Sequence, residues 1–266
     1  MTPKGAYMEI TLLDTNNLAQ ELLIMSKNTR HLDDPNVWDQ ILKMSEAEKA
    51  KELEYVFGTI TSAFEFVDYV FLLRDVTRAF THQVVRHRVG TSFAQQSMRV
   101  APAEAFKYFV PDDLERDQYQ IAVYDSTMMS IQEGYNLLLN KGTDVQDARG
   151  VLPTNICTNI LMKINLRALA LLMETRLCIR AQGEFQQVAL AMKEIVSEIH
   201  PWAAHLLFPM CVAKNHCQFI NFKECPLKNK YPHLQPIKGD LKSKVENDWM
   251  KLMEHNYSPQ PKQSII

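Results

Sequence analysis

The sequence predicts an α+β fold in which a small sheet packs against long helices. Segments 6–14 and 63–73 are rich in β-branched and aromatic residues, which indicates strands. Segment 117–140 carries apolar residues at intervals of three and four, the period of an amphipathic helix. The chain has 266 residues, of which 46% are hydrophobic. A chain of this length and composition can bury a large core without disulfide bonds.

Two helices are predicted in the N-terminal part of the chain. Asp14 and the Thr-Asn-Asn that follows it are expected to cap a helix over about 18–27. Ser45 and Glu48 match the capping box, in which each side chain bonds to the backbone N–H of the other residue. A second helix is therefore expected to begin there and to reach about Val56.

The middle of the chain alternates between strands, a helix and a loop. The alternation of Phe64 and Phe66 supports the strand over 63–73. Asp75 is expected to cap a helix that runs through about His87. A polar loop over 89–98 and a short strand near 107–110 complete this part.

The second half is predominantly helical. The predicted elements are a helix over 117–140 ended by Gly142, a short helix over 145–149, a strand over 158–164, and helices near 166–176 and 181–199. Beyond Lys214 the composition is polar and rich in proline (Pro226, Pro232, Pro236, Pro259 and Pro261). We therefore predict a folded, catalytic domain over 1–213 and a loosely packed C-terminal extension over 214–266.

Charge and targeting patterns exclude several function classes. The 29 Lys and Arg residues against 31 Asp and Glu give a net charge of −2, so no overall field attracts nucleic acid or a membrane surface. No run of about 18 apolar residues and no secretory signal near Met1 is present. Five cysteines, an odd number, fit a reducing compartment. We expect a cytoplasmic protein that binds neither nucleic acid nor a membrane.

The densest polar cluster comprises Gln83, Arg86, His87 and Arg88, followed by Ser97 and Arg99. If the preceding helix continues to residue 87, Gln83 and His87 lie one helical step apart on the same side. Arginine suits an anion site because its planar fork pairs bidentately with phosphate. The cluster is therefore interpreted as an anion site, and the alternative is a solvated helix end that makes surface ion pairs.

A second cluster comprises Arg149, Asn165, Arg167, Arg176, Arg180, Gln182 and Glu184. Arg176 and Arg180 are four residues apart, and like charges at that spacing repel unless a carboxylate or an anion lies between them. In one hypothesis, the Glu184 side chain is that carboxylate. The alternative is that Arg176, which lies among apolar neighbours, points into a polar pocket and needs a partner there.

With both clusters in order, the sequence resembles the flavin-dependent thymidylate synthase family over roughly residues 60–210. The matching motifs are Phe64-Glu65, Gln83-x-x-Arg86-His87-Arg88, Ser97-x-Arg99, Ala148-Arg149-x-Val-Leu-Pro153, Asn165-x-Arg167, Arg176 and Ala181-Gln182-x-Glu184. The resemblance implies a mixed α/β subunit that assembles into a homotetramer with active sites between subunits. It also implies FAD as cofactor, dUMP as substrate, methylenetetrahydrofolate as one-carbon donor and NADPH as reductant.

The resemblance assigns roles to individual residues. The implied nucleotide-binding residues are Gln83, Arg86, Gln95, Ser97, Arg99, Arg149 and Arg176. The implied flavin-binding residues are Arg86, His87, Arg88, Gln95, Asn165 and Arg180. Arg176 is also the implied catalytic residue, because a guanidinium on the pyrimidine stabilises negative charge gathering on its carbonyl oxygens. No enzyme thiol is required, since the flavin supplies hydride and mediates carbon transfer.

The chain departs from the family pattern at several positions. One residue is inserted in Val89-Gly-Thr91, and Ala94-Gln95 stands where the family commonly has Asn-Glu. Thr61, Phe66 and Arg180 stand where histidines are expected, and Leu171 stands where an asparagine is expected. Three hypotheses remain: a diverged synthase, a paralogue that acts on another pyrimidine nucleotide or performs hydroxymethylation, and a flavin- and nucleotide-binding homologue without catalysis.

The three cysteines nearest the end of the chain are candidate metal ligands. Cys211, His216, Cys217 and Cys225 follow the spacing C-x4-H-C-x7-C, which matches no standard zinc finger because no C-x-x-C pair is present. We predict no metal site on this spacing, and a zinc site is the alternative.

Overall fold

The computed structural model describes residues 8–214, 216–217, 219, 222–230, 240–256 and 262–265. Its sheet has the strand order β3-β4-β2-β1-β5. The strands are β1 (Glu9–Thr15), β2 (Asp68–Thr77), β3 (Thr91–Gln95), β4 (Cys157–Asn165) and β5 (Lys262–Ile265). Neighbouring strands are antiparallel except β5, which runs parallel to β1. The predicted α+β fold is confirmed.

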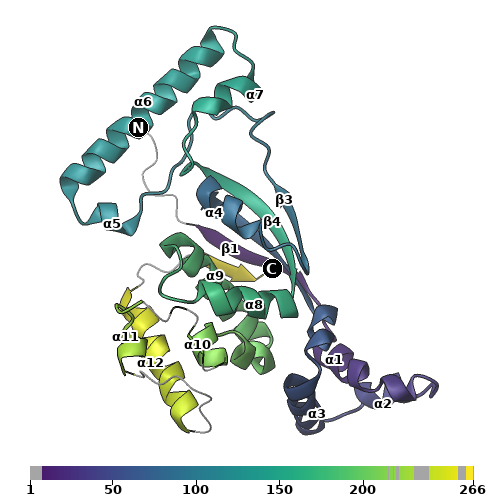
Figure 1. The fold of residues 1–266 in the computed structure, drawn as a ribbon. Helices are drawn as coiled ribbons and strands as arrows, with labels where there is room; N and C mark the ends of the chain where they lie inside the picture. Colours follow the sequence, from purple (N-terminus) through teal and green to yellow (C-terminus); the bar gives the residue numbers. More distant parts are fainter. Residues whose placement is uncertain are drawn as a thin grey trace.

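Helices surround this sheet and extend beyond it (Figure 1). The α-helices are α1 (Ala19–Lys27), α2 (Val37–Leu42), α3 (Glu46–Thr59), α4 (Arg78–Val84), α5 (Asp112–Glu115), α6 (Gln118–Asn140), α7 (Val145–Ala148), α8 (Leu166–Arg176), α9 (Gly183–Ile199), α10 (Met210–Ala213), α11 (Pro226–Lys230) and α12 (Asp240–Asn256). Short 3₁₀ helices span Thr29–His31, Thr61–Phe66, Arg149–Val151 and Pro201–Leu206. In Figure 1, α8 and α9 lie beside the sheet, while α6 and the α1–α3 group project from opposite ends.

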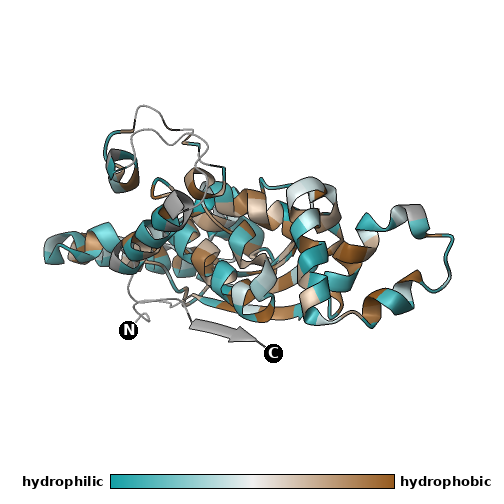
Figure 2. Ribbon diagram, turned by 90° about the horizontal axis from the view of Figure 1, so that it is seen from below, coloured by the Kyte–Doolittle hydropathy of each residue, from teal (hydrophilic) through white to brown (hydrophobic). Residues whose placement is uncertain are grey.

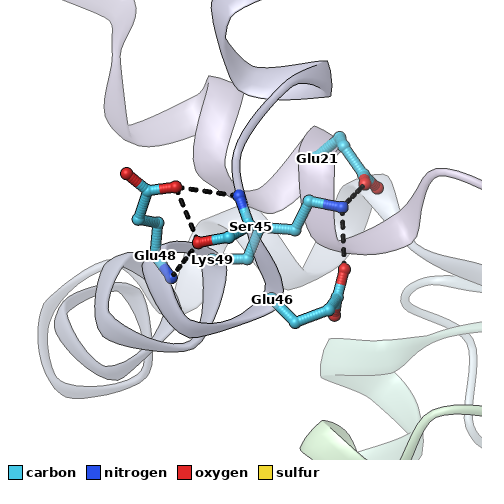
Figure 3. A network of polar contacts seen from close by, with 5 residues as sticks. All are labelled: Glu21, Ser45, Glu46, Glu48 and Lys49. Carbon is cyan, nitrogen blue, oxygen red and sulfur yellow. Dashed lines mark hydrogen bonds and ion pairs between the residues drawn. The ribbon is translucent and has the colours of Figure 1, made fainter.

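The capping box at the start of α3 is confirmed (Figure 3). The Ser45 backbone N–H donates to Glu48 Oε2 at 2.8 Å, and the Glu48 backbone N–H donates to Ser45 Oγ at 3.4 Å. One residue further on, the Lys49 ammonium contacts Glu21 on α1 at 2.7 Å and Glu46 at 3.0 Å. This ion pair between Lys49 and Glu21 holds α3 against α1.

The predicted cap of α1 is wrong. Leu18 occupies the N-cap position without a side-chain hydrogen bond, and Asp14 belongs to β1, which continues to Thr15. The pairing of Asp14 with Val70 across the sheet explains this difference, because strand pairing uses the segment that the local pattern assigned to a turn.

Strand β2 and helix α4 both begin later than predicted. Phe64 and Phe66 lie in the 3₁₀ helix before β2. Asp75 lies within β2 at a register shift, with a φ of 53°, and its N–H donates to the Asn159 side chain at 3.0 Å. Thr77 caps α4 instead, accepting from the Phe80 N–H at 2.9 Å.

The segment 89–98, predicted as a loop, contains β3. Its residues pair with β4, so an exposed and polar sequence became an edge strand by hydrogen bonding to a partner. The short strand expected near 107–110 is reduced to a single bridge between Tyr108 and Ile156.

The later elements agree closely with the sequence prediction. The predicted helix over 166–176 is confirmed at both ends as α8, and the strand over 158–164 is confirmed as β4 with one more residue at each end. Asp117 caps α6, and Gly142 follows the end of α6 with a φ of 87°. These boundaries depend on local capping and turn chemistry.

The C-terminal extension is not loosely packed where the structure describes it. Val245, Trp249 and Met253 of α12 are buried in the main core, and the Trp249 indole N–H donates to the Leu177 carbonyl at 3.1 Å. The apolar face of α12 therefore corrects the expectation drawn from composition. The boundary at residue 214 remains a prediction.

Parts of several sequence predictions cannot be compared with the structure. Residues 6 and 7 of the first predicted strand, and Pro232, Pro236, Pro259 and Pro261, lie outside the described residues.

The distribution of hydrophobic residues matches the arrangement of a central sheet and surrounding helices. Figure 2 shows hydrophobic segments along the strands in the middle of the molecule and mixed colours along the surrounding helices. Among the described residues, no helix combines the length and the apolar character needed to cross a membrane.

Candidate active site

Helix α4 carries the first predicted cluster and is anchored by a buried carboxylate. Glu184, in the first turn of α9, accepts hydrogen bonds from the Thr77 backbone N–H at 2.6 Å and from the Thr77 hydroxyl at 2.5 Å. Burial raises the pKa of Glu184, and the two bonds from Thr77 oppose that shift. Glu184 therefore does not lie between Arg176 and Arg180 as one hypothesis held. It joins the start of α4 to the start of α9.

The end of α4 also contacts the residue that begins α9. The Gln83 side chain donates to the Gln182 side-chain oxygen, and Gln182 is the N-cap residue of α9. Two motifs distant in sequence are thus brought together at the ends of two helices. Because α4 ends at Val84, the predicted one-step helical relation between Gln83 and His87 is wrong.

Three residues of the first predicted cluster lie in the segment that follows α4 and its C-cap Val85. Arg86 and Arg88 are exposed, whereas His87 is half-buried. The exposed guanidiniums are accessible to an anion, and the imidazole points toward the protein interior.

An aromatic ring brings His87 next to Arg176. The Arg176 guanidinium carbon lies 4.2 Å from the centroid of the Phe185 ring, and the centroid of the His87 ring lies 6.1 Å from it. Burial lowers the pKa of His87, and the charge of Arg176 lowers it further. Both effects favour the uncharged imidazole, which does not repel the arginine beside it.

One hydrogen-bond donor of the Arg176 side chain has no partner among the described residues. This donor is Nε, which is buried, and burial lowers the pKa of the side chain. A buried donor without a partner costs about 1–3 kcal/mol. A side chain held in this state is suited to pairing with a bound oxygen. That Arg176 points into a polar pocket stays a prediction.

Arg180 does not share a helical face with Arg176. Helix α8 ends at Arg176, and the Arg180 guanidinium lies over the rings of Phe219 and Phe222, at 4.4 and 5.0 Å. Arg180 thus contacts the C-terminal segment. Its role in flavin binding stays a prediction from the resemblance.

The inserted residue in 89–91 is accommodated by a glycine. Gly90 has a φ of 71°, and a Cβ at this position would lie 2.6 Å from Asn165 Nδ2. The Asn165 backbone N–H donates to the Gly90 carbonyl at 2.9 Å, and its side-chain oxygen accepts from the Ala168 N–H at 2.8 Å. Asn165 is thereby fixed in place, and most of its surface is buried.

Gln95, at the end of β3, reaches α4. Its side-chain N–H donates to the Thr81 hydroxyl at 3.0 Å. The residue that stands in place of a family carboxylate thus has a neutral partner on the helix that carries Gln83.

A second group of cations lies beyond β3. The Arg99 N–H donates to Ser97 Oγ at 3.3 Å, and its guanidinium reaches the Gln146 side chain at 3.5 Å. Arg149 donates to the Gln146 carbonyl at 3.0 Å. Ser97, Arg99, Gln146 and the acidic Asp144 line a surface hollow. Two of the predicted phosphate-binding residues, Ser97 and Arg99, thus share it, whereas Gln83 lies at Gln182.

Sequence reasoning missed two residues of this region. Burial lowers the pKa of Arg78, the first residue of α4, and the charge of nearby Arg149 lowers it further. Phe185, which joins His87 to Arg176, follows Glu184 directly. Its place next to the Gln182-x-Glu184 motif was the available signal, but only the packing shows which groups it contacts.

The Arg167 guanidinium donates to the Glu65 carboxylate at 2.6 Å. This ion pair joins two further motifs of the resemblance, and because both side chains are about half exposed, it contributes little to stability.

Comparison with known proteins places the chain in a family. The family model "Thymidylate synthase complementing protein" matches residues 11–202. The chain belongs to this family. Three curated relatives carry the name flavin-dependent thymidylate synthase, which confirms the predicted resemblance.

The relatives match over different lengths. The Sulfurisphaera tokodaii protein is 35% identical over 60% of this chain and 61% of its own length. The Nitratidesulfovibrio vulgaris protein is 33% identical over 62% of this chain and 72% of its own length. The Pyrococcus furiosus protein is 30% identical over 80% of this chain and 84% of its own length. The chain thus matches about three fifths of the length of the first of these relatives.

A solved structure shows the same fold. The UMP/dUMP methylase PolB from Streptomyces cacaoi, bound with 5-Br dUMP, aligns with a TM-score of 0.64 and 19% identity. The alignment covers 75% of this chain and 94% of that protein.

Proposed function

We propose that the protein is an FAD-dependent thymidylate synthase. In this proposal it converts dUMP to dTMP by reductive methylation, with methylenetetrahydrofolate as carbon donor and NADPH as reductant. The family supports the reaction type, and the names of the relatives support a flavin cofactor.

The Arg176–Phe185–His87 group carries the proposal. Arg176 lies on an aromatic ring, is half-buried and has a buried Nε without a partner in the described chain. A pyrimidine carbonyl at this position would accept from Arg176, and the guanidinium would stabilise negative charge on that oxygen as the ring carbon is activated. The lowered pKa of His87 disfavours a second positive charge beside Arg176.

The nucleotide phosphate is assigned to the second group of cations. Ser97, Arg99 and Arg149 lie around Gln146, and Arg78 lies near Arg149. Arg78 and Gln83 are five residues apart on α4, a rise of about 7.5 Å. Helix α4 thus carries Arg78 at its start and Gln83 near its end, and both residues are assigned to the nucleotide in this proposal.

The residues around α4 fit a flavin. Arg86 and Arg88 are exposed guanidiniums two residues apart in the segment after α4, a donor set that pairs with a pyrophosphate. Gly90 lets the backbone approach Asn165 closely, where any Cβ would collide. When bound, the flavin supplies hydride and mediates carbon transfer; Arg86, His87, Arg88 and Asn165 would hold it.

Assembly and location are part of the same proposal. We propose a homotetramer with active sites between subunits, as the resemblance implies. A reducing cytoplasm is supported by the five cysteines, all of which carry free thiols.

A second candidate function uses the same site but has another substrate or product. Gln95 bonds to Thr81 rather than adding a carboxylate to the site, which changes the charge near the nucleotide. A paralogue that acts on another pyrimidine nucleotide, or that stops at hydroxymethylation, would use the same Arg176.

Product mass tests these candidates. The purified protein is loaded with FAD, reduced without oxygen, and mixed with methylenetetrahydrofolate and dUMP. A nucleotide heavier by one methyl group supports the synthase. A hydroxymethyl product, or turnover with UMP alone, supports the paralogue. A protein that binds no FAD and leaves dUMP unchanged overturns both and supports the non-catalytic homologue.

A further inference from the structure

The end of helix α8, which places Arg176, is held by side chains from two other helices. Arg176 is the last residue of α8, and Leu177 is its C-cap. The carbonyl groups in the last turn of a helix have no partner within the helix, so other donors satisfy them when they are buried. Leu177 is fully buried, and its carbonyl accepts two side-chain hydrogen bonds.

The two donors come from α9 and α12. The Trp249 indole N–H donates to the Leu177 carbonyl at 3.1 Å, and the Gln186 side-chain N–H donates to the same oxygen at 3.3 Å. Gln186 also donates to the Cys178 carbonyl at 2.9 Å. Both donor side chains are buried, so these bonds form at low local dielectric, where they are strong. The backbone directly after Arg176 is therefore fixed by tertiary contacts.

The same helices also hold the guanidinium. Phe185, whose ring centroid lies 4.2 Å from the Arg176 guanidinium carbon, is the neighbour of Gln186 in α9. Helix α9 thus contacts Arg176 through its side chain and the end of α8 through its backbone. Trp249 adds the contact from α12, a helix that lies beyond residues 11–202 matched by the family model.

The Trp249 ring is itself held by its surroundings. It packs edge to face against Phe208, with 5.6 Å between the ring centroids. The buried Lys193 ammonium lies 3.8 Å from the Phe208 centroid and 5.8 Å from the Trp249 centroid. The indole N–H is therefore a preorganised donor to the end of α8.

We propose that Trp249 and Gln186 are positioning residues for Arg176. By holding the Leu177 carbonyl, they set where α8 ends and hence where the Arg176 guanidinium lies. The placement of Arg176 follows from these contacts alone, whereas its consequence for turnover rests on the proposed function. Helix α12 is in this way part of the structure that orients the arginine of the site.

Turnover of dUMP measures the consequence for the reaction. Trp249→Phe keeps an aromatic ring and removes the N–H, and Gln186→Met keeps the length of the side chain and removes its donors. Each should lower kcat by about 10–100-fold while FAD stays bound, because a displacement of about 1 Å at a reacting group costs about 100-fold. Met253→Ala is the matched control, since Met253 is also buried on α12; it should unfold more easily but keep the wild-type kcat.

The pKa of His87 reports the position of Arg176 without substrate or flavin. The charge of Arg176 contributes to lowering this pKa, so moving the guanidinium away should raise it. In an NMR titration, Trp249→Phe and Gln186→Met should each raise the pKa, by no more than Arg176→Gln does. Met253→Ala should keep the wild-type value. The His87 signal is identified among those of the eight histidines by its loss in His87→Gln.

These two measurements separate the possible failures. A wild-type pKa of His87 in both Trp249→Phe and Gln186→Met overturns the proposal, and so does an equal rise in Met253→Ala, which would indicate a general effect of core packing. A raised pKa with an unchanged kcat overturns the role in the reaction. If the wild-type protein turns over no pyrimidine nucleotide, the proposed function fails, and the pKa comparison still decides whether the two residues place Arg176.

Discussion

Replacing Gly90 with alanine should destabilise the protein through two separate effects. The backbone at Gly90 has a φ of 71°, which an alanine adopts at a cost of about 1–2 kcal/mol. The added Cβ would also lie 2.6–2.8 Å from three atoms of the Asn165 side chain. Asn165 cannot move away without breaking its 2.8 Å bond to the Ala168 N–H at the start of α8.

The second effect can be isolated with a matched control. Loss of an asparagine N-cap costs about 1 kcal/mol, so Gly90→Ala should lower the free energy of unfolding by about 2–3 kcal/mol in total. Gly142 also has a positive φ, of 87°, but a Cβ there would meet nothing within 4 Å. Gly142→Ala should therefore cost only the backbone term of about 1–2 kcal/mol.

Urea denaturation of the two variants, without flavin, measures the difference. We expect Gly90→Ala to be less stable than Gly142→Ala by about 1 kcal/mol, the value of the cap. Flavin affinity should fall in Gly90→Ala alone if Asn165 contacts the flavin. Equal destabilisation in the two variants would refute the role of the Gly90–Asn165 contact.

Further predictions concern the site itself. Arg176→Ala should abolish turnover while FAD stays bound; comparable turnover would remove its proposed role. Arg99→Ala should weaken dUMP binding by up to about 1 kcal/mol, the scale for an ion pair at the surface, because the Arg99 side chain is exposed, and an unchanged Kd by calorimetry would place the phosphate elsewhere. Thr77→Val should lower the free energy of unfolding by about 2–4 kcal/mol, because it removes the α4 cap and strips a donor from buried Glu184, whereas Thr77→Ser keeps both oxygens and should unfold like the wild type. The pKa of His87 lies below its usual value of about 6.5, so its contribution to stability is present above that pH and is lost as the pH falls toward the folded-state pKa; in an NMR titration Arg176→Gln should raise this pKa only partly, because burial is the larger cause.

Local patterns predicted the elements whose ends depend on neighbouring residues. The capping box of α3 and the start of α8, which Asn165 caps, follow from side chains within three positions of the helix end. The start of α4 was missed for a reason outside the local pattern. Asp75 is an equally good cap by residue type, but β2 continues through it and pairs with β4, which leaves Thr77 as the cap.

The ordered motifs were sufficient to predict family membership and the residues that gather around α4. They did not predict which groups meet. Glu184 was a candidate partner for two arginines, yet it bonds to Thr77. Arg180 was expected beside Arg176, yet it contacts Phe219 and Phe222.

The sequence by itself determined the fold class, most helix and strand positions in the second half, and the set of residues available for chemistry. The tertiary structure alone decided that Phe185 joins Arg176 to His87, and that Trp249 of α12 donates to the Leu177 carbonyl at the end of α8. The physical reason is the range of the interactions. Caps and turns form between residues close in the chain, whereas these contacts depend on how the helices pack on the sheet and on one another.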